Sequence, residues 1–546
     1  MKNEKLALLG DEAVALGAIH SGISAAYGYP GTPSTEILQY LINESKTGGF
    51  SASWCSNEKT ALEAALGVSF SGMRSIVTMK HVGLNVASDP FINSALLKIK
   101  GGLVVAVADD PGMHSSQNEQ DSRFYSNFAM IPCLEPRSQQ EAYNMVREAF
   151  DVSECFNIPV LLRLVTRLAH ARAAVIPRPE KAKNKLSKIQ DITSWMLLPA
   201  FARKNYEGLL MKQKILEEWS YQHPVNRIIS PKTSAASGGK KGDLAVITSG
   251  VGGNYYEENL HDFTAMRKKE GKDAPVWLHI GAYPLPEKMI RKIFDDAESV
   301  LIIEEGQNFI AQKIFGIVGA VLKPVIQSGE LDPDNVRKAL GLPSRQGLKI
   351  TTGALAARPP VLCQACPHND SFNAVNKAVA FLDPRAGHPD IAVNSDIGCY
   401  SLGASAPLSA IESIVCMGAC IGMAKGASDA GMKYALAVIG DSTFIHSGIT
   451  PLIDTVQANA PITIIILDNS SVAMTGCQPT IVQSKNLKSL LTGCGVKEDH
   501  IIELEAKPNL VDDNAMKLKA EIEYRGLSVV IFRRECVESI RKNKQE

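Results

Sequence analysis

Two short polar segments, each directly after a long apolar run, constrain the fold of this chain more than any other feature. The apolar runs cover residues 434–439 and 462–467, and they are followed by residues 440–442 (Gly-Asp-Ser) and 468–469 (Asp-Asn). Uninterrupted apolar runs of this length predict buried parallel strands. Open α/β sheets bind ligands at the carboxyl ends of such strands, so we expect a binding site where the two polar segments meet.

The residue types in these segments indicate a magnesium-held diphosphate. Mg²⁺ takes oxygen ligands in near-octahedral geometry and completes its shell with phosphate and water. The side chains of Asp441 and Asn469 and the backbone carbonyl of Ser471 would supply the protein ligands. The alternative is a pair of ordinary strand-end turns, which Asp, Asn and Ser also favour.

The spacing resembles the thiamine diphosphate motif, and residues 468–478 (DNSSVAMTGCQ) resemble the corresponding segment of 2-oxoacid:ferredoxin oxidoreductases. Within that family the chain resembles the large (alpha) subunits of the indolepyruvate type, from about residue 6 to about residue 537. The resemblance implies an α/β fold with three doubly wound domains. They are a pyrimidine-binding domain (1–178), a transketolase-C-like domain (243–345) after a linker (179–242), and a domain for the diphosphate, Mg²⁺ and a cluster (358–546).

The resemblance also implies which residues contact the cofactor. They are Glu58, Cys399, Gly440, Asp441, Ser442, Asn469, Met474 and Thr475. Glu58 would meet the aminopyrimidine ring, where a carboxyl with a raised pKa can assist proton removal from thiamine. The alternative is that Glu58 only decorates a helix N-terminus, where acidic residues are favoured.

Cysteines are numerous and uneven, and their pattern points to metal ligation. The chain has 11 of them, an odd count that makes disulfides the weaker expectation. Cys363 and Cys366 form a Cys-x-x-Cys pair, Cys399 follows, and Cys536 lies near the end. A close pair plus two remote thiolates can hold a [4Fe–4S] cluster, and the resemblance implies one beside thiamine. A zinc site that includes His368, or unligated thiols, are the alternatives.

Substrate contacts are expected near the N-terminus. Residues 27–36 form a proline-bounded turn before a predicted helix, whose N-terminus suits a substrate carboxylate. The resemblance implies Thr32, Ser115 and Ser116 as substrate-binding residues. His81 is a candidate for proton transfer, although a lone histidine is as often structural.

The resemblance implies oxidative decarboxylation of an aryl or branched 2-oxoacid to an acyl-CoA, with coenzyme A as co-substrate. The implied partners are a small gamma-type (beta) subunit and ferredoxin, in a heterodimer or a dimer of heterodimers. The sequence ends ten residues after Cys536, whereas related subunits continue into a ferredoxin-like region. We therefore expect a separate iron–sulfur protein, or an acceptor that docks directly at the cluster. A third possibility is non-oxidative chemistry.

Two other functional classes stay open at this point. A thiamine-dependent lyase or ligase would act on a 2-oxoacid or acyl-CoA without external electron transfer, and a regulatory paralogue would not bind thiamine. Lys+Arg and Asp+Glu number 57 each, so we expect neither nucleic acid nor a membrane as partner. The absence of a secretion signal predicts a cytoplasmic protein.

Overall fold

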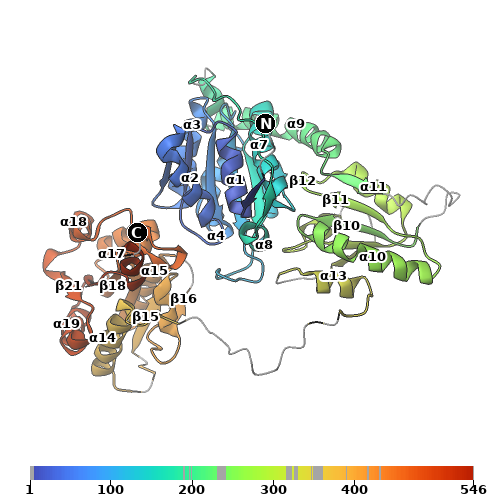
Figure 1. The fold of residues 1–546 in the computed structure, drawn as a ribbon. Coiled ribbons are helices and arrows are strands. Elements are labelled where there is room, and N and C mark those ends of the chain that lie inside the picture. The colour runs from blue at the N-terminus through green and yellow to red at the C-terminus, as the bar shows by residue number, and fades with distance from the viewer. Residues whose placement is uncertain are drawn as a thin grey trace. The chain divides into compact units, whose positions relative to one another are not determined.

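The computed structural model describes residues 5–187, 191–195, 197, 199–229, 242–314, 322–324, 330–345, 347, 361–385, 387–388, 390–414, 417–429 and 432–544. The chain divides into two compact units, Met1–Lys349 and Ile350–Glu546 (Figure 1). Each unit is built from mainly parallel sheets covered by helices, which confirms the predicted α/β class. Among the described residues, every helix is too short or too polar to cross a bilayer.

The first unit begins with a seven-stranded sheet in which only β12 runs antiparallel. In spatial order its strands are β12 (Ala282–Tyr283), β6 (Cys133–Leu134), β7 (Val160–Val165), β5 (Leu103–Asp109), β4 (Ser75–Lys80), β2 (Ala25–Gly28) and β3 (Ser51–Trp54). Its helices are α1 (Gly10–Ile19), α2 (Thr35–Gly48), α3 (Glu58–Phe70), α4 (His81–Val86), α5 (Ser88–Ser94), α6 (Arg123–Ala129), α7 (Gln139–Phe156) and α8 (Thr166–His170). A two-stranded ribbon of β1 (Leu6–Leu8) and β8 (Ala173–Val175) lies beside them.

The strand register of this sheet collects several loops at one edge. Gly28 lies beside Thr78, and Lys80 lies beside Ala108, so that β2, β4 and β5 end close together. β4, β5 and β7 are buried along their whole length, as their apolar sequences require. The loops after these strands therefore form one candidate ligand-binding edge.

A second sheet completes the first unit. Its order is β14 (Leu322–Pro324), β13 (Val300–Ile303), β10 (Ala245–Ser249), β11 (Val276–Ile280) and β9 (Arg227–Ile229), with β9 antiparallel. The helices of this part are α9 (Pro199–Gln222), which precedes β9, and α10 (Gly252–Lys269), α11 (Glu287–Asp296), α12 (Phe309–Ile314) and α13 (Pro333–Ala339), with a 3₁₀ turn at Ile192–Trp195.

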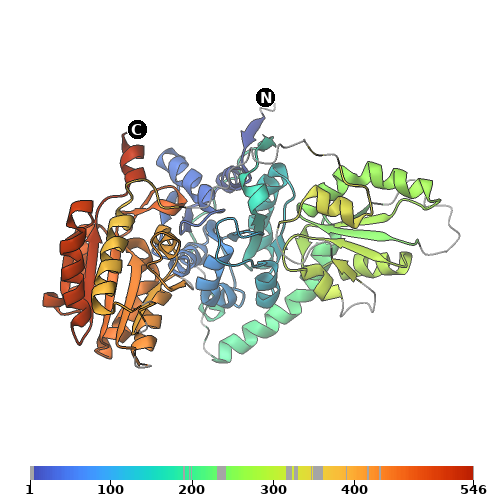
Figure 2. The same ribbon diagram turned by 90° about the horizontal axis from the view of Figure 1, so that it is seen from below.

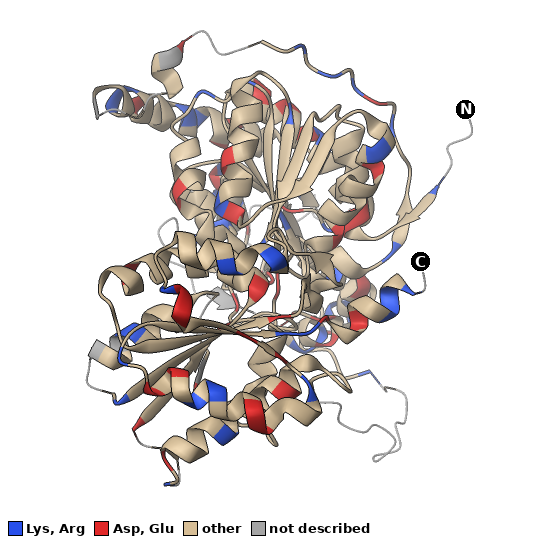
Figure 3. Cartoon of the chain, turned by 90° about the vertical axis from the view of Figure 1, so that its left-hand side faces the viewer, with Lys and Arg blue, Asp and Glu red and all other residues tan. Residues whose placement is uncertain are grey.

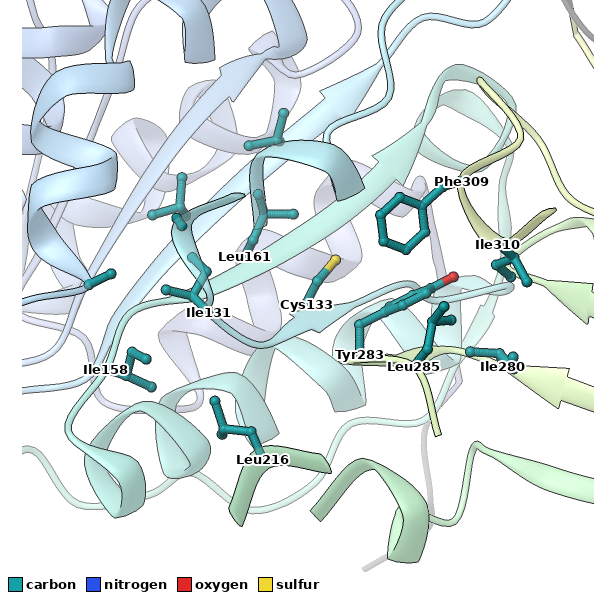
Figure 4. Close-up of a cluster of buried hydrophobic side chains, with 14 of the residues drawn as sticks. Ile131, Cys133, Ile158, Leu161, Leu216, Ile280, Tyr283, Leu285, Phe309 and Ile310 are labelled. Atoms are coloured by element: carbon teal, nitrogen blue, oxygen red, sulfur yellow. The ribbon is translucent and has the colours of Figure 1, made fainter. Parts of the chain in front are cut away.

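The two sheets of the first unit share a hydrophobic core. After β11 the chain returns to the first sheet, where β12 pairs with β6. Figure 4 shows Cys133, Tyr283 and Phe309 together in this core, and the rings of Tyr283 and Phe309 lie 5.8 Å apart edge to face. A core continuous across both sheets makes this half of the chain one structural body.

A buried ion network crosses the same junction. The Arg123 guanidinium is fully buried and pairs with Asp121 at 2.5 Å and with Glu304 at 3.2 Å. It also donates to the hydroxyls of Ser249 (3.1 Å) and Tyr283 (3.3 Å). Removing one member would leave several buried charges without compensation.

The second unit contains a six-stranded, fully parallel sheet, seen in Figures 1 and 2 with helices around it. Its order is β16 (Ser413–Ile414), β15 (Ile391–Ser395), β17 (Tyr434–Gly440), β18 (Ile462–Asp468), β22 (Ser528–Arg533) and β21 (Ile501–Glu505). Helices α14 (Pro367–Leu382) and α19 (Val511–Glu523) pack on one face, and α15 (Ala419–Asp429), α17 (Ile449–Gln457) and α18 (Leu487–Gly493) pack on the other. The remaining elements are α16 (Asp441–Thr443), α20 (Val537–Asn543) and a hairpin of β19 (Ser471–Val472) and β20 (Gln478–Pro479).

Charged side chains are distributed without a dominant sign. In Figure 3, blue Lys and Arg positions and red Asp and Glu positions both occur on the helices. Totals of 57 basic and 57 acidic residues agree with this pattern.

We predict that Arg123→Met destabilises the first unit. The substitution keeps most of the side-chain volume but leaves Glu304 without its buried cation and Asp121 with only Arg163, 3.5 Å away. The free energy of unfolding should fall by about 3–5 kcal/mol in urea denaturation followed by circular dichroism. Arg541→Met is the matched control, because Arg541 is 59% exposed and its pair with Glu538 should contribute under about 1 kcal/mol. Equal effects of the two substitutions would contradict the importance of the network.

Candidate functional site

The two predicted phosphate-binding segments lie side by side at the carboxyl edge of the second sheet. β17 and β18 are parallel neighbours, with Gly440 opposite Leu467, so Asp441 follows one strand where Asp468 ends the other. Asp441 opens α16, which continues through a π-helical stretch at Phe444–Gly448 into α17. Such π-turns inside helices occur frequently at functional sites.

Of the two carboxylates at this edge, that of Asp441 is available to a cation. Asp468 is already compensated, because it accepts from Arg533 Nε (3.0 Å) and from Ser484 Oγ (2.7 Å). Asp441 is buried, and its Oδ2 has no hydrogen-bond partner among the described residues. Burial and the nearby charge of Asp468 raise the pKa of Asp441 well above its usual range. A divalent cation would offset both penalties.

Asn469 and Ser471 lie on the loop that follows β18. The amide of Ser471 donates to Asn469 Oδ1 (3.1 Å), which orients this oxygen and leaves it a second lone pair. The Ser471 hydroxyl is buried without a partner in the described structure. Hard oxygen donors left unsatisfied on adjacent loops fit Mg²⁺.

His368 supports the amide of Asn469. Its Nε2 lies 3.4 Å from Asn469 Nδ2. Burial, with the charge of Arg534, lowers the pKa of His368 to about 4, so the neutral ring can accept from the amide. The histidine that the zinc alternative would use therefore faces the phosphate loop.

Tyr400 and Asp396, both buried, pack beneath the segment that contains Gly440. A Cβ on Gly440 would lie 2.6 Å from the Tyr400 ring, so the ring requires glycine there. The Tyr400 hydroxyl donates to Asp396, which also accepts from the Gly418 amide at 3.0 Å. Gly418 has a φ of +83°, a conformation suited to glycine. Burial raises the pKa of Asp396 to about 6.

The remaining cofactor candidates flank these loops. Ser442 lies in α16, directly after Asp441. Met474 and Thr475 lie in the connection between β19 and β20, where Met474 is 49% exposed and the Thr475 hydroxyl bonds to Gln478. An exposed thioether at a ligand edge is a candidate contact for an apolar ring.

The four predicted cluster cysteines converge, although they come from separate elements. Cys363 and Cys366 precede α14, Cys399 begins a 3₁₀ turn after β15, and Cys536 caps α20. The charge of Cys536 contributes to raising the pKa of each of the first three thiols, so all four lie within electrostatic range. Burial and the neighbouring thiols raise the pKa of Cys366 to about 11 and of Cys399 to about 12, so metal binding would have to displace protons.

Among these four described cysteines, no three sulfurs lie as close together as a preformed tetrahedral zinc site would place them. Among the described residues, no three cysteine sulfurs lie within 4.8 Å of one another. Tetrahedral zinc with Zn–S bonds of about 2.3 Å would bring its sulfur ligands to about 3.8 Å apart. A cubane separates its thiolates further, because iron and sulfide lie between them. Cys477, which the sequence reasoning did not select, also lies close enough for its charge to act on Cys399.

The backbone ties the last cysteine to the phosphate loop. The Cys536 amide donates to the Asn469 carbonyl, and the Arg534 amide donates to the Asp468 carbonyl, both at 3.1 Å. The Arg534 guanidinium donates to the carbonyl of Ala365 (2.8 Å), inside the Cys-x-x-Cys loop. The sites for diphosphate and for the thiols are therefore neighbours on one sheet edge.

In the first unit, Glu58 lies buried in the first turn of α3. The Asn57 side chain caps this helix by accepting from the Thr60 amide (2.8 Å). A Cβ on Gly83 would lie 2.4 Å from Glu58 Oε1, so glycine in α4 makes room for the carboxylate. Glu58 is thus held against α4 at the ligand edge.

Lys80, at the end of β4, lies next to the predicted substrate residues, and the sequence analysis assigned it no role. Its ammonium is buried and donates to the Ser115 carbonyl (3.0 Å), while the Ser115 hydroxyl donates to the Thr32 carbonyl (3.0 Å). Burial lowers the pKa of Lys80 to about 8, against the opposing charges of Asp110 and Glu58. A lone lysine after an apolar strand carries no distinctive sequence signal.

The other predicted substrate residues surround Lys80. Ser116 Oγ donates to Asp110 (2.7 Å), which also accepts from the Ser115 amide (2.8 Å). His81 is buried, with Nε2 positioned to donate to the Asn118 carbonyl (3.1 Å) and Nδ1 without a partner among the described residues. An accepting Nδ1 would suit a proton-transfer role.

Comparison with known proteins gives a consistent result. Residues 16–225 match the family of pyruvate flavodoxin/ferredoxin oxidoreductases at its thiamine diphosphate-binding region, and residues 396–511 match the C-terminal TPP-binding domain of thiamine pyrophosphate enzymes. The chain is 36% identical to the indolepyruvate oxidoreductase subunit IorA of Archaeoglobus fulgidus, over 98% of this chain and 87% of that protein. The IorA protein of Thermococcus kodakarensis is 35% identical over 98% and 86%.

A solved structure shares the fold. It is the 2-oxoglutarate:ferredoxin oxidoreductase from Magnetococcus marinus, with a TM-score of 0.52 and 15% sequence identity, covering 62% of this chain and 65% of that one.

We predict that Asp441 governs thiamine diphosphate binding. Saturation with Mg²⁺ and the cofactor at about 100 times the dissociation constant should stabilise the wild type by about 2.7 kcal/mol. Asp441→Asn should lose most of this gain without destabilising the ligand-free protein, because it removes a buried charge near Asp468. Thermal melts with and without ligand measure both effects. Asp454→Asn, at an exposed position on α17, is the control; equal protection of the two variants would argue against the site.

Proposed function

Because the chain belongs to the family of indolepyruvate oxidoreductase IorA subunits, we propose that it catalyses oxidative decarboxylation of an aryl 2-oxoacid of the indolepyruvate kind. The reaction converts a 2-oxoacid, coenzyme A and two oxidised ferredoxins into an acyl-CoA, CO₂, a proton and two reduced ferredoxins. The observation that carries this proposal is the shared edge of the phosphate loops and four cysteines, joined by the bond from Cys536 to Asn469.

Thiamine diphosphate and a [4Fe–4S] cluster would supply the carbanion chemistry and the one-electron transfer when bound. Asp441, Asn469 and the carbonyl of Ser471 would hold the Mg²⁺, with Gly440 and Ser442 beside the diphosphate. Cys363, Cys366, Cys399 and Cys536 would hold the cluster. Met474 and Thr475 would contact the thiamine rings.

Residues of the first unit would act on the pyrimidine and the substrate. Glu58 would exchange a proton with the aminopyrimidine ring. We assign the substrate carboxylate to the Lys80 ammonium, with Thr32, Ser115 and Ser116 around it, because Lys80 is a buried cation at the ligand edge. His81 would move a proton through Nδ1, which has no hydrogen-bond partner in the part of the chain that the structure describes.

The same family membership supports the domain and assembly assignments proposed here. Residues 1–178 would serve as pyrimidine-binding domain, 243–345 as transketolase-C-like domain and 358–546 as diphosphate and cluster domain. The relatives are named as subunits, which supports a partner chain. We propose a small gamma-type subunit in a heterodimer or a dimer of heterodimers, ferredoxin or a similar acceptor, and a cytoplasmic location. Coenzyme A is bound in the Magnetococcus marinus enzyme, which supports its role as co-substrate here.

We predict that anaerobically purified protein contains about four irons per chain. Together with its partner subunit, it should reduce a viologen dye only when the 2-oxoacid, coenzyme A, Mg²⁺ and thiamine diphosphate are all present. Cys366→Ser should lose iron and dye reduction, whereas the exposed Cys155→Ser should retain both. Thiamine-dependent turnover without iron or dye reduction would instead support a non-oxidative lyase or ligase.

We predict that deprotonation of Lys80 lowers the kcat/KM of the reaction at high pH. Its pKa of about 8 means that the ammonium, and with it carboxylate binding, is lost as pH rises through that value. The kcat/KM for the 2-oxoacid should therefore decline above about pH 8 in the wild type. Lys80→Met should reduce kcat/KM by about 10- to 100-fold, mainly through KM, in line with ~1.5–3 kcal/mol for a charged hydrogen bond.

Two further variants test this assignment. Lys80→Arg should keep binding at high pH, because arginine stays protonated. Lys98→Met, at an exposed lysine, should behave as wild type. An unchanged pH profile in Lys80→Arg would refute the role of Lys80.

A further inference from the structure

A second group of ligand-type side chains lies in the first unit, apart from the residues assigned above. It consists of Asp11 in α1, Glu36 in α2 and His170 at the end of α8. One ligand atom from each lies within 4.8 Å of the others. Three helices therefore present two carboxylates and an imidazole to one point.

Asp11 is the unusual member of the group. It is fully buried, and neither carboxylate oxygen accepts from a donor among the described residues, so that only a protonated Asp11 could bond to Glu36. A buried carboxylate without a partner is costly, so the structure must supply a proton or a cation at this position. Glu36 and His170 are part-exposed, with side-chain accessibilities of 42% and 35%, so an ion can reach the group from solvent.

Close packing fixes the positions of these groups. A Cβ on Gly10 would lie 2.2 Å from the Leu168 carbonyl oxygen, so glycine allows α1 and α8 to touch. That contact brings Asp11, the next residue, toward His170. Glu36 lies in the first turn of α2, where His170 Nε2 is 3.5 Å from its Oε2.

We propose that Asp11, Glu36 and His170 form a binding site for a divalent cation of the zinc class. Mixed carboxylate and imidazole donors suit Zn²⁺, Co²⁺ and similar ions, and three protein ligands leave positions for water. The ion would join α1, α2 and α8, and so steady the Gly31–Ser34 turn that precedes α2.

Binding of the cation would replace protons that these side chains carry in its absence. Without metal, burial raises the pKa of Asp11 well above its usual range, and the bond to Glu36 raises the pKa of His170. Both shifts favour the protonated forms of Asp11 and His170 when no metal is bound. A divalent cation bound by these groups would displace such protons, so binding should be accompanied by proton release.

The test uses the full chain, stripped with a chelator and titrated with Co²⁺ under anaerobic conditions. The wild type should bind one equivalent more than either Asp11→Asn or His170→Gln. The difference spectrum should show nitrogen- and oxygen-ligated cobalt without the thiolate charge-transfer bands of cysteine sites. Proton release, followed in weak buffer, should fall in the same variants.

Matched control variants distinguish a metal-binding site from a proton shared between two carboxyl groups. Glu44→Gln, exposed on α2, and His261→Gln, 95% exposed on α10, should bind Co²⁺ as the wild type does. Equal cobalt stoichiometry in wild type and His170→Gln would overturn the proposal and leave a proton-sharing carboxyl pair. His170→Gln keeps the test valid if Asp11→Asn folds poorly, because the imidazole is part-exposed.

Discussion

The arrangement of the second unit depends on how the chain leaves two adjacent parallel strands. Beyond the ends of β18 and β22, the amides of Arg534 and Cys536 continue the pairing by donating to the carbonyls of Asp468 and Asn469, each at 3.1 Å. The backbone therefore holds the last cysteine against the loop that carries Asn469. The Arg534 side chain extends the same connection to the Cys-x-x-Cys loop through the Ala365 carbonyl. A diphosphate anchor and an electron acceptor beside each other are what thiamine-dependent oxidation requires.

Buried charge is the common problem at the ligand edges of both units, and it is compensated in different ways. Arg533 neutralises Asp468, whereas Asp441 is left for a cation. Lys80 is held between Glu58 and Asp110, which oppose the effect of burial on its pKa. Asp11 accepts no hydrogen bond from a donor among the described residues, and Glu36 adds to the effect of burial on its pKa. Where the protein provides no compensating group for a buried ion, an external one is expected.

Sequence reasoning succeeded where a local pattern carried the information. The apolar runs identified β17 and β18, and therefore the loops with Asp441 and Asn469, because buried parallel strands need continuous apolar sequence. Contacts between segments that are distant in the sequence could not be predicted in this way. β12 is only two residues long, so its return to the first sheet leaves no periodic signal. The burial and the neighbours of Lys80 are set by distant segments, so its sequence context does not reveal them. The same holds for the group formed by Asp11, Glu36 and His170.

The most direct test of the central claim is the magnetic coupling between the two sites on this sheet edge. Mn²⁺ can replace Mg²⁺ with thiamine diphosphate, and the cluster can be reduced with dithionite. Electron paramagnetic resonance should then show dipolar broadening and faster relaxation of the cluster signal in the presence of Mn²⁺, compared with Mg²⁺. Identical cluster spectra with the two metals, at full occupancy of both sites, would contradict the shared edge and the function built on it.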